Sequence, residues 1–206
     1  MKKLIKYLIT LFFKFKPTKF DIEGKEVVLL CNGPSLNEVD FSKIRLPLIG
    51  LNKIFLKKNI HNRLTFVVSV NKFVIRQMAK SKYARELHRK IPIYIPSHRF
   101  INKIFLRKAL FINLSNKNDF VDKSMIFGVG STVTYVALQI LFKLNVSKVY
   151  IIGMDHNFNQ TGRSNETQTL KGNDLNHFDP NYFKNMKWQL ADLENSENSY
   201  AIAQKL

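Results

Sequence analysis

The chain has 206 residues, 45% of them hydrophobic, which fits one folded domain rather than two domains or a disordered polypeptide. Its single cysteine, Cys31, excludes an internal disulfide framework and any zinc site built from several cysteines, and it favours a reducing, cytoplasmic location. The 33 Lys and Arg residues exceed the 15 Asp and Glu residues, and the net charge of +18 predicts attraction to polyanions. No recognition helix, aromatic RNA platform or zinc finger is legible, which argues against sequence-specific nucleic-acid binding.

Residues 1–16 alternate bulky apolar side chains with five lysines. This segment is too short and too charged to span a bilayer, which takes about 20 mostly apolar residues. It is typical of an interfacial helix on an anionic membrane, and we expect a peripheral location at the inner face of the cytoplasmic membrane. The alternative is a terminal helix that packs on its own domain or on a partner. We therefore divide the chain into a basic amphipathic segment, 1–20, and a nucleotide-binding domain, 21–206.

Short, dense runs of apolar residues in the first half of the chain predict buried parallel strands. Such strands are expected at 27–31, 47–51, 64–70 and 91–95, and a helix is expected over 72–89. A polar residue follows directly after each of the first three runs: Asn32 after Cys31, Asn52 after the second run and Asn71 after the third. Residues 100–115 are strongly basic and fit either structure. Further on, 133–144 is amphipathic and 148–153 is β-branched, so loop, helix and strand form half of a βαβ unit.

Two loops carry the residue types that hold phosphate and ribose. Ligands of open α/β sheets bind at the carboxyl ends of the strands, where Asn32-Gly33-Pro34-Ser35 and Asn52 are expected to converge. The tetrapeptide is also ordinary turn chemistry, which is the alternative. Gly130-Ser131-Thr132 opens a helix and offers unpaired amides at the positive end of the helix dipole, although either hydroxyl can act simply as a helix cap. This loop lacks a P-loop lysine and the third glycine of a dinucleotide fingerprint.

Acidic and imidazole groups follow the last predicted strand. Gly153-Met154-Asp155-His156 places a carboxylate where a ribose or base can donate to it, or where it caps a turn. His177 lies beside Asp179 in a polar loop, where an imidazole can act as a general base, whereas a solvated loop histidine is the alternative. The two histidines and two aspartates match no established zinc spacing, and we expect no metal.

Two blocks of the sequence, 30–40 and 130–158, resemble a known enzyme family. They are similar to the bacterial sialyltransferases of glycosyltransferase family 42, and more so to a related family described as 6-hydroxymethylpterin diphosphokinase-like, a former domain of unknown function (115). The related family also occurs in flagellar motility accessory factors and polysaccharide loci. The shared parts are the Gly-Ser-Thr-Val helix start, the Ile-Gly-Met-Asp-His turn and the Asn-His-Phe-Asp-Pro-Asn-Tyr-Phe block at 176–183.

This resemblance implies an α/β fold with a Rossmann-like, mostly parallel sheet flanked by helices, similar to a GT-A variant, in a single domain. It implies a CMP-activated nonulosonic acid donor, inversion at the anomeric carbon and no obligatory cofactor. It also implies that a C-terminal portion present in longer relatives is missing after Leu206. Carried over onto this sequence, the donor-binding residues are Asn32, Gly33, Pro34, Ser35, Asn52, Gly130, Ser131, Thr132, Gly153, Asp155 and His156.

The resemblance further implies that His177 is the general base that deprotonates the acceptor. The sialyltransferases stabilise the leaving phosphate with a pair of tyrosines, where this chain has Asn157, Phe158 and Arg163, so Arg163 is expected to offset that charge. The expected function is transfer of a sugar from a CMP-linked donor to a surface glycan or lipid-linked acceptor. Two alternatives remain: a pterin pyrophosphokinase using ATP and Mg²⁺, and a non-catalytic module that binds nucleotides or polyanions.

Overall fold

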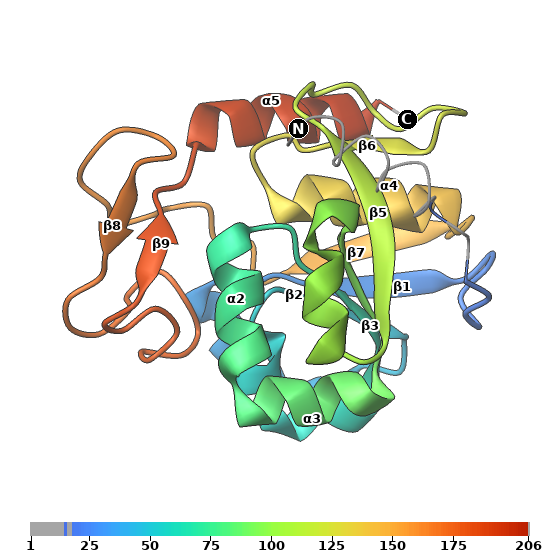
Figure 1. The fold of residues 1–206 in the computed structure, drawn as a ribbon. Helices are drawn as coiled ribbons and strands as arrows, with labels where there is room; N and C mark the ends of the chain where they lie inside the picture. Colours follow the sequence, from blue (N-terminus) through green and yellow to red (C-terminus); the bar gives the residue numbers. More distant parts are fainter. Residues whose placement is uncertain (1–14, 16–17, 206) are drawn as a thin grey trace.

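Seven parallel strands form the central sheet in the computed structural model, which describes residue 15 and residues 18–205 (Figure 1). Their order across the sheet is β6-β5-β4-β3-β2-β1-β7. The strands are β1 (Glu26–Leu30), β2 (Leu48–Leu51), β3 (Leu64–Val68), β4 (Ile93–Pro96), β5 (Ala109–Ser115), β6 (Ile126–Gly128) and β7 (Lys148–Ile152). The expected fold class is confirmed: this is one Rossmann-like α/β domain with a parallel sheet flanked by helices.

The strands in the middle of the sheet are apolar because both of their faces are covered. Every residue of β2 and β4 is buried, as are the last four of β1. A continuous apolar run is the sequence signature of a parallel strand between two helical layers. The runs at 27–31, 47–51, 64–70 and 91–95 therefore identified β1 to β4 to within two residues at each end.

Two apolar clusters lie on opposite faces of the sheet. One cluster packs α2 (Lys72–Lys80), α3 (Lys82–Lys90) and the short 3-10 helices against residues such as Leu30, Leu48 and Val67. The other packs α4 (Val133–Lys143) against the alternate residues, such as Leu29, Ile49 and Phe66. The 3-10 helices are η1 (Pro34–Asn37), η2 (Phe41–Lys43), η3 (Ile54–Leu56), η4 (Lys58–Arg63) and η5 (Ser97–Ile104).

The helix expected over 72–89 is two helices, and Ser81 is the reason. This residue has an extended backbone (φ −76°, ψ 125°), and its side chain caps α3 by accepting from the Ala84 amide. A serine that bonds the backbone of the following turn ends one helix and starts the next.

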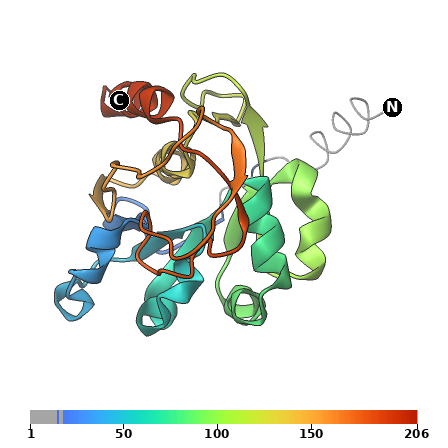
Figure 2. The same ribbon diagram turned by 90° about the vertical axis from the view of Figure 1, so that its left-hand side faces the viewer.

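The chain beyond β7 crosses the carboxyl ends of the strands before it forms a last helix. It contains a two-stranded antiparallel hairpin, β8 (Thr167–Thr169) and β9 (Lys187–Gln189), and then α5 (Leu193–Gln204). Figure 2 looks at the molecule from this side, and the segment between β7 and α5 faces the viewer. Among the described residues, no helix is long and apolar enough to cross a membrane.

The predicted membrane-binding segment, 1–16, lies outside the described residues except for Phe15. The Phe15 ring is buried on the α4 face of the sheet, 5.0 Å from the Phe127 ring centroid and 5.8 Å from that of Tyr94. Phe15 is therefore part of the core of the domain, and an interfacial helix in this segment would have to use the apolar residues that precede it.

Candidate functional site

A cavity of about 500 Å³ lies at the carboxyl ends of the parallel strands. Each of the seven strands contributes a loop to its wall, which is why polar residues from distant parts of the sequence meet there. Polar lining residues from these loops include, in sequence order, Asn32, Asn52, Asn71 and Lys72, His98, Asn116, Ser131 and Thr132, and Asp155 and His156. Ligands of open α/β sheets bind at this edge.

The loops that follow β1 and β7 lie side by side and form one continuous part of the cavity wall. β1 pairs with both β2 and β7, and the chain reaches β7 from β6 at the far edge of the sheet. The Gly33 amide donates to the Gly153 carbonyl at 2.8 Å, so the two loops remain bonded to each other beyond the strand ends. Asn32, Gly33, Gly153 and Asp155 all line this part of the wall.

Asn32 presents an unsatisfied acceptor in the cavity wall. Its Nδ2 donates to the Leu51 carbonyl at 3.1 Å, and its backbone carbonyl accepts from the Phe178 amide at 2.9 Å. Its Oδ1 is buried and has no hydrogen-bond partner among the described residues. Because buried polar atoms are nearly always paired, this oxygen is a site where a ligand N–H or O–H can bind.

Asp155 holds the loop after β1 in place. Its Oδ2 accepts from the Ser35 amide at 2.9 Å, and its Oδ1 accepts from the Ser35 hydroxyl. A Cβ atom on Gly33 would come within 2.5 Å of Oδ2, so only glycine leaves room for this carboxylate. Asp155 lines the cavity, whereas Pro34 and Ser35, predicted as donor-binding residues, do not line it, and Ser35 instead holds the carboxylate through its amide and hydroxyl.

The loop before α4 is shaped by two residues with positive φ, Gly130 (+53°) and Ser131 (+57°). Thr132 is the N-cap of α4: its Oγ1 accepts from the Thr134 amide at 3.3 Å and lies 3.1 Å from the Tyr200 hydroxyl. Ser131 and Thr132 line the cavity at the positive end of the α4 dipole, where anions are stabilised. Capping and ligand binding are therefore compatible at this loop.

Gly130 does not line the cavity. A Cβ atom at this position would lie 2.3 Å from the Tyr135 ring and 2.6 Å from Ser199 Oγ. The glycine lets α5 pack closely against the start of α4, so it shapes the site indirectly.

His177 is oriented by a buried carboxylate. Its Nδ1 lies 3.0 Å from both oxygens of Asp174, which also accept from the Asn176 and Phe183 amides. The imidazole stacks on the Tyr182 ring at 4.0 Å with an interplanar angle of 8°. Donation from Nδ1–H to Asp174 leaves Nε2 with its lone pair, and this nitrogen makes no hydrogen bond to a described residue. Such a histidine, in the wall of a cavity, can accept a proton.

The partner of His177 is Asp174, not its sequence neighbour Asp179, which accepts from the Asn181 amide instead.

Two residues near the site were not predicted from the sequence, Asp174 and Lys53. The buried amine of Lys53 contacts the Tyr182 carbonyl and the Phe183 ring. Burial lowers the pKa of Lys53 to about 8, against the influence of Asp174 and Asp179. The only signal for Asp174 is its position three residues before a histidine.

The structure places the remaining candidates as follows. His156 lines the cavity, with Nε2 3.3 Å from Glu197 Oε1 and its ring against Tyr200 of α5. Arg163 is exposed and does not line the cavity; its backbone amide donates to Glu166 at 3.0 Å. Cys31 lines the cavity, but burial raises the pKa of its thiol to about 12, which keeps it protonated and unreactive at neutral pH.

Within the described part of the chain, no three His, Cys, Asp or Glu side chains are grouped so that they could hold a metal ion. No protein-family model, curated protein or solved structure matches this chain.

Proposed function

We propose that this chain is a sialyltransferase-like glycosyltransferase that uses a CMP-activated nonulosonic acid to modify a cell-surface glycan. The observation that carries the proposal is His177, paired with the buried Asp174, in the wall of a cavity that is lined by small polar side chains as well as by apolar and aromatic residues such as Phe158 and Trp188. A base and a nucleotide-type binding edge in one cavity suit group transfer to a hydroxyl.

The proposed chemistry is an inverting displacement. Nε2 of His177 removes the proton of the acceptor hydroxyl as its oxygen attacks the anomeric carbon, and the bond to the CMP phosphate breaks. The proton remains on the imidazole, and the negative charge of Asp174 stabilises the imidazolium that forms. CMP leaves as the second product.

Three features of the cavity support binding of the donor. Its volume of about 500 Å³ lies within the range of small-molecule sites, roughly 300–1,000 Å³. The amides at the start of α4 and the side chain of Lys72 suit a phosphate, and the unpaired Oδ1 of Asn32 suits a donor group on the base or sugar. Arg163 has no place in this cavity, so we assign the leaving phosphate to the α4 loop.

Ligand-induced shifts in the melting temperature of the full chain test this proposal. CMP, CDP, UDP, GDP and ATP are compared, each with and without Mg²⁺. Stabilisation by CMP or CDP without metal is the expected result, because no metal is needed in the proposed mechanism. Stabilisation only by ATP with Mg²⁺ would indicate the pyrophosphokinase alternative, and no shift with any nucleotide would favour the polyanion-binding module.

Hydrolysis and transfer assays with CMP-N-acetylneuraminic acid then test the base. We expect His177→Ala to lower turnover by about 10²- to 10⁴-fold, the usual contribution of a positioned base, and to leave the CMP-induced shift unchanged. Asp174→Asn should lower turnover through the orientation and charge of the imidazole, whereas Asp179→Asn is the matched control. Full turnover in His177→Ala would exclude it as the base.

A further inference from the structure

An exposed apolar and basic surface surrounds η5, on the same face of the sheet as α2. Ile101, Ile104 and Phe105 are 63%, 71% and 45% exposed, among the most exposed large apolar residues of the described chain. Lys103 and Arg107 lie between and beside them in the sequence and are also exposed. We call these five residues the η5 surface. Large apolar side chains grouped at one exposed site usually contact a partner.

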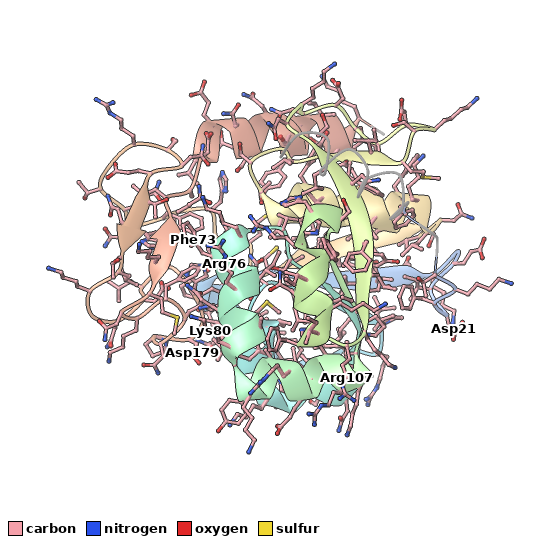
Figure 3. The ribbon with its side chains drawn as sticks, viewed as in Figure 1. Asp21, Phe73, Arg76, Lys80, Arg107 and Asp179 are labelled. Atoms are coloured by element: carbon pink, nitrogen blue, oxygen red, sulfur yellow. The ribbon has the colours of Figure 1, made fainter. Side chains whose placement is uncertain are left out.

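Basic side chains of α2 and α3 extend the η5 surface. Arg76 and Lys80 lie one turn apart on α2 (Figure 3), and together with Arg85 they line a groove whose other side is Asn102 and Phe105. Burial, and to a smaller extent the like charge of Arg76, lowers the pKa of Arg99. The three basic side chains that line the groove suit an anion.

The segment that forms the η5 surface and the groove contains few acidic side chains. Residues 41–118 contain 18 Lys and Arg but a single acidic residue, Glu86, so they carry nearly all of the net charge of +18. Among the described residues, none of the ion pairs involves the basic side chains of the η5 surface or of the groove. The charge is therefore available to an external polyanion.

We propose that the η5 surface binds anionic phospholipid membranes. Ile101, Ile104 and Phe105 enter the boundary between headgroups and acyl chains, while Lys103, Arg107 and the groove arginines contact lipid phosphates. Ile101 and Ile104 favour a membrane over a nucleic acid, because an isoleucine gains nothing from a phosphate backbone and cannot stack on a base, and Phe105 is the one aromatic ring of the η5 surface.

The position of η5 next to the cavity gives this surface a functional consequence. η5 begins at Ser97, directly after β4, and His98 lines the cavity. A membrane bound at the η5 surface therefore lies beside one wall of the cavity, where a lipid-linked substrate can reach it. The lipid-binding proposal does not depend on the proposed transferase activity.

Sedimentation of the full chain with lipid vesicles tests the proposal. The vesicles are pure phosphatidylcholine, or phosphatidylcholine with 30% phosphatidylglycerol. We expect binding to the anionic vesicles only. Ile101→Ser with Ile104→Ser should weaken it by roughly tenfold or more, because the transfer of about two large apolar side chains is lost. Arg76→Gln, Lys80→Gln, Lys103→Gln and Arg107→Gln together should weaken it at least as much, since each charge near such a membrane contributes about fivefold.

Matched controls carry the same changes elsewhere on the surface. Leu175→Ser with Ile202→Ser removes exposed apolar groups, and Lys143→Gln, Lys148→Gln, Lys171→Gln and Lys184→Gln remove four charges. We expect both controls to bind like the unaltered chain, and circular dichroism confirms that every variant is folded. If Ile101→Ser with Ile104→Ser binds anionic vesicles as tightly as the unaltered chain, the proposal is overturned.

A second measurement locates the contact. Anionic vesicles should slow hydrogen exchange of the amides in 99–107, and an unchanged rate there would also overturn the proposal. Binding of a mixed-sequence RNA provides the comparison with a nucleic acid. If the variant without the four charges of the η5 surface and the groove loses RNA binding but keeps vesicle binding, the surface is a nucleic-acid site and the lipid proposal fails.

Discussion

Gly33 shows how one residue fixes the shape of the candidate site. Its backbone is ordinary (φ −70°, ψ 163°), so the need for glycine is steric, not conformational. A Cβ atom would meet Asp155 Oδ2 at 2.5 Å, its Cγ at 2.7 Å and the Gly153 carbonyl at 2.8 Å. These contacts are too short to form without moving the carboxylate away from Ser35.

We predict that Gly33→Ala destabilises the protein by about 1–3 kcal/mol, the usual cost of overpacking. Denaturant unfolding measures the free energy, and the CMP-induced shift in melting temperature should shrink because the loop after β1 moves.

A double-mutant cycle separates this steric effect from a general weakening of the loop. In an Asp155→Ala background the carboxylate is absent, so Gly33→Ala should cost less, with a coupling of at least about 0.5 kcal/mol. Additive effects of the two changes would show that Asp155 is not what excludes a side chain at position 33.

The residues of the site differ in how well the sequence predicts them. Four of them follow a recognisable strand or start a helix, namely Asn32, Asn52, Ser131 and Asp155. Because the carboxyl ends of parallel strands meet at one edge of a sheet, the sequence alone predicted that these four residues lie close together. Asp174 lies in an irregular segment that has no periodicity, and only the fold of that segment places it against His177.

At the scale of elements, α5 completes the cavity although few apolar contacts hold it. Its buried residues are Ser196 and Ser199, and its links to the rest of the site are polar: Tyr200 with Thr132, Glu197 with His156, and Asp192 with Ser131 and Asn165. Asp192 is also the N-cap, accepting from the Asn195 amide at 3.3 Å.

We predict that Asp192→Ala releases α5 before the rest of the domain. Loss of an N-cap costs about 0.5–2 kcal/mol, and here the links to Ser131 and Asn165 are lost as well. Hydrogen exchange should become faster in 193–204 while the amides of β1 to β4 stay protected. Glu194→Ala, an exposed change in the first turn of the same helix, is the control. Equal exchange in both variants would contradict a role for Asp192 in holding α5.

Two elements, β6 and α5, were not predicted from the sequence, each for its own physical reason. β6 has three residues, which is too short for a periodic pattern, and α5 has no apolar stripe, because its sequence is Leu-Glu-Asn-Ser-Glu-Asn-Ser-Tyr-Ala-Ile-Ala-Gln. The ambiguous stretch 100–115 contains the last part of η5 and all of β5. Its exposed apolar residues imitate a core pattern, and a surface of this kind cannot be told from a buried one by composition alone.

At the scale of the whole molecule, the sheet order explains why one cavity gathers residues 30 to 200. Six strands run in sequence order from β1 to β6 across the sheet, and β7 then returns to pair with β1. This return brings the loop after β7 beside the loop after β1, and the segment that follows β7 then closes the cavity with His177 and α5.

The sheet order also separates the charges of the molecule. The strongly basic residues 41–118 form the side that contains β2 to β5, whereas the acidic residues of the site lie in the segment that follows β7.

If the cavity binds CMP as one site, protection must appear in distant segments together. At a CMP concentration of 100 times Kd, binding stabilises the folded protein by about 2.7 kcal/mol, which slows globally exchanging amides by roughly 100-fold. We expect slower exchange in 31–35, 130–135, 153–158 and 174–178, which surround the cavity, and unchanged exchange in 44–46 and 145–147, which precede β2 and β7 at the opposite edge of the sheet. Hydrogen exchange with and without CMP measures this difference. Protection of a single segment, or of the amides at the opposite edge, would mean that the strand ends do not act as one nucleotide site.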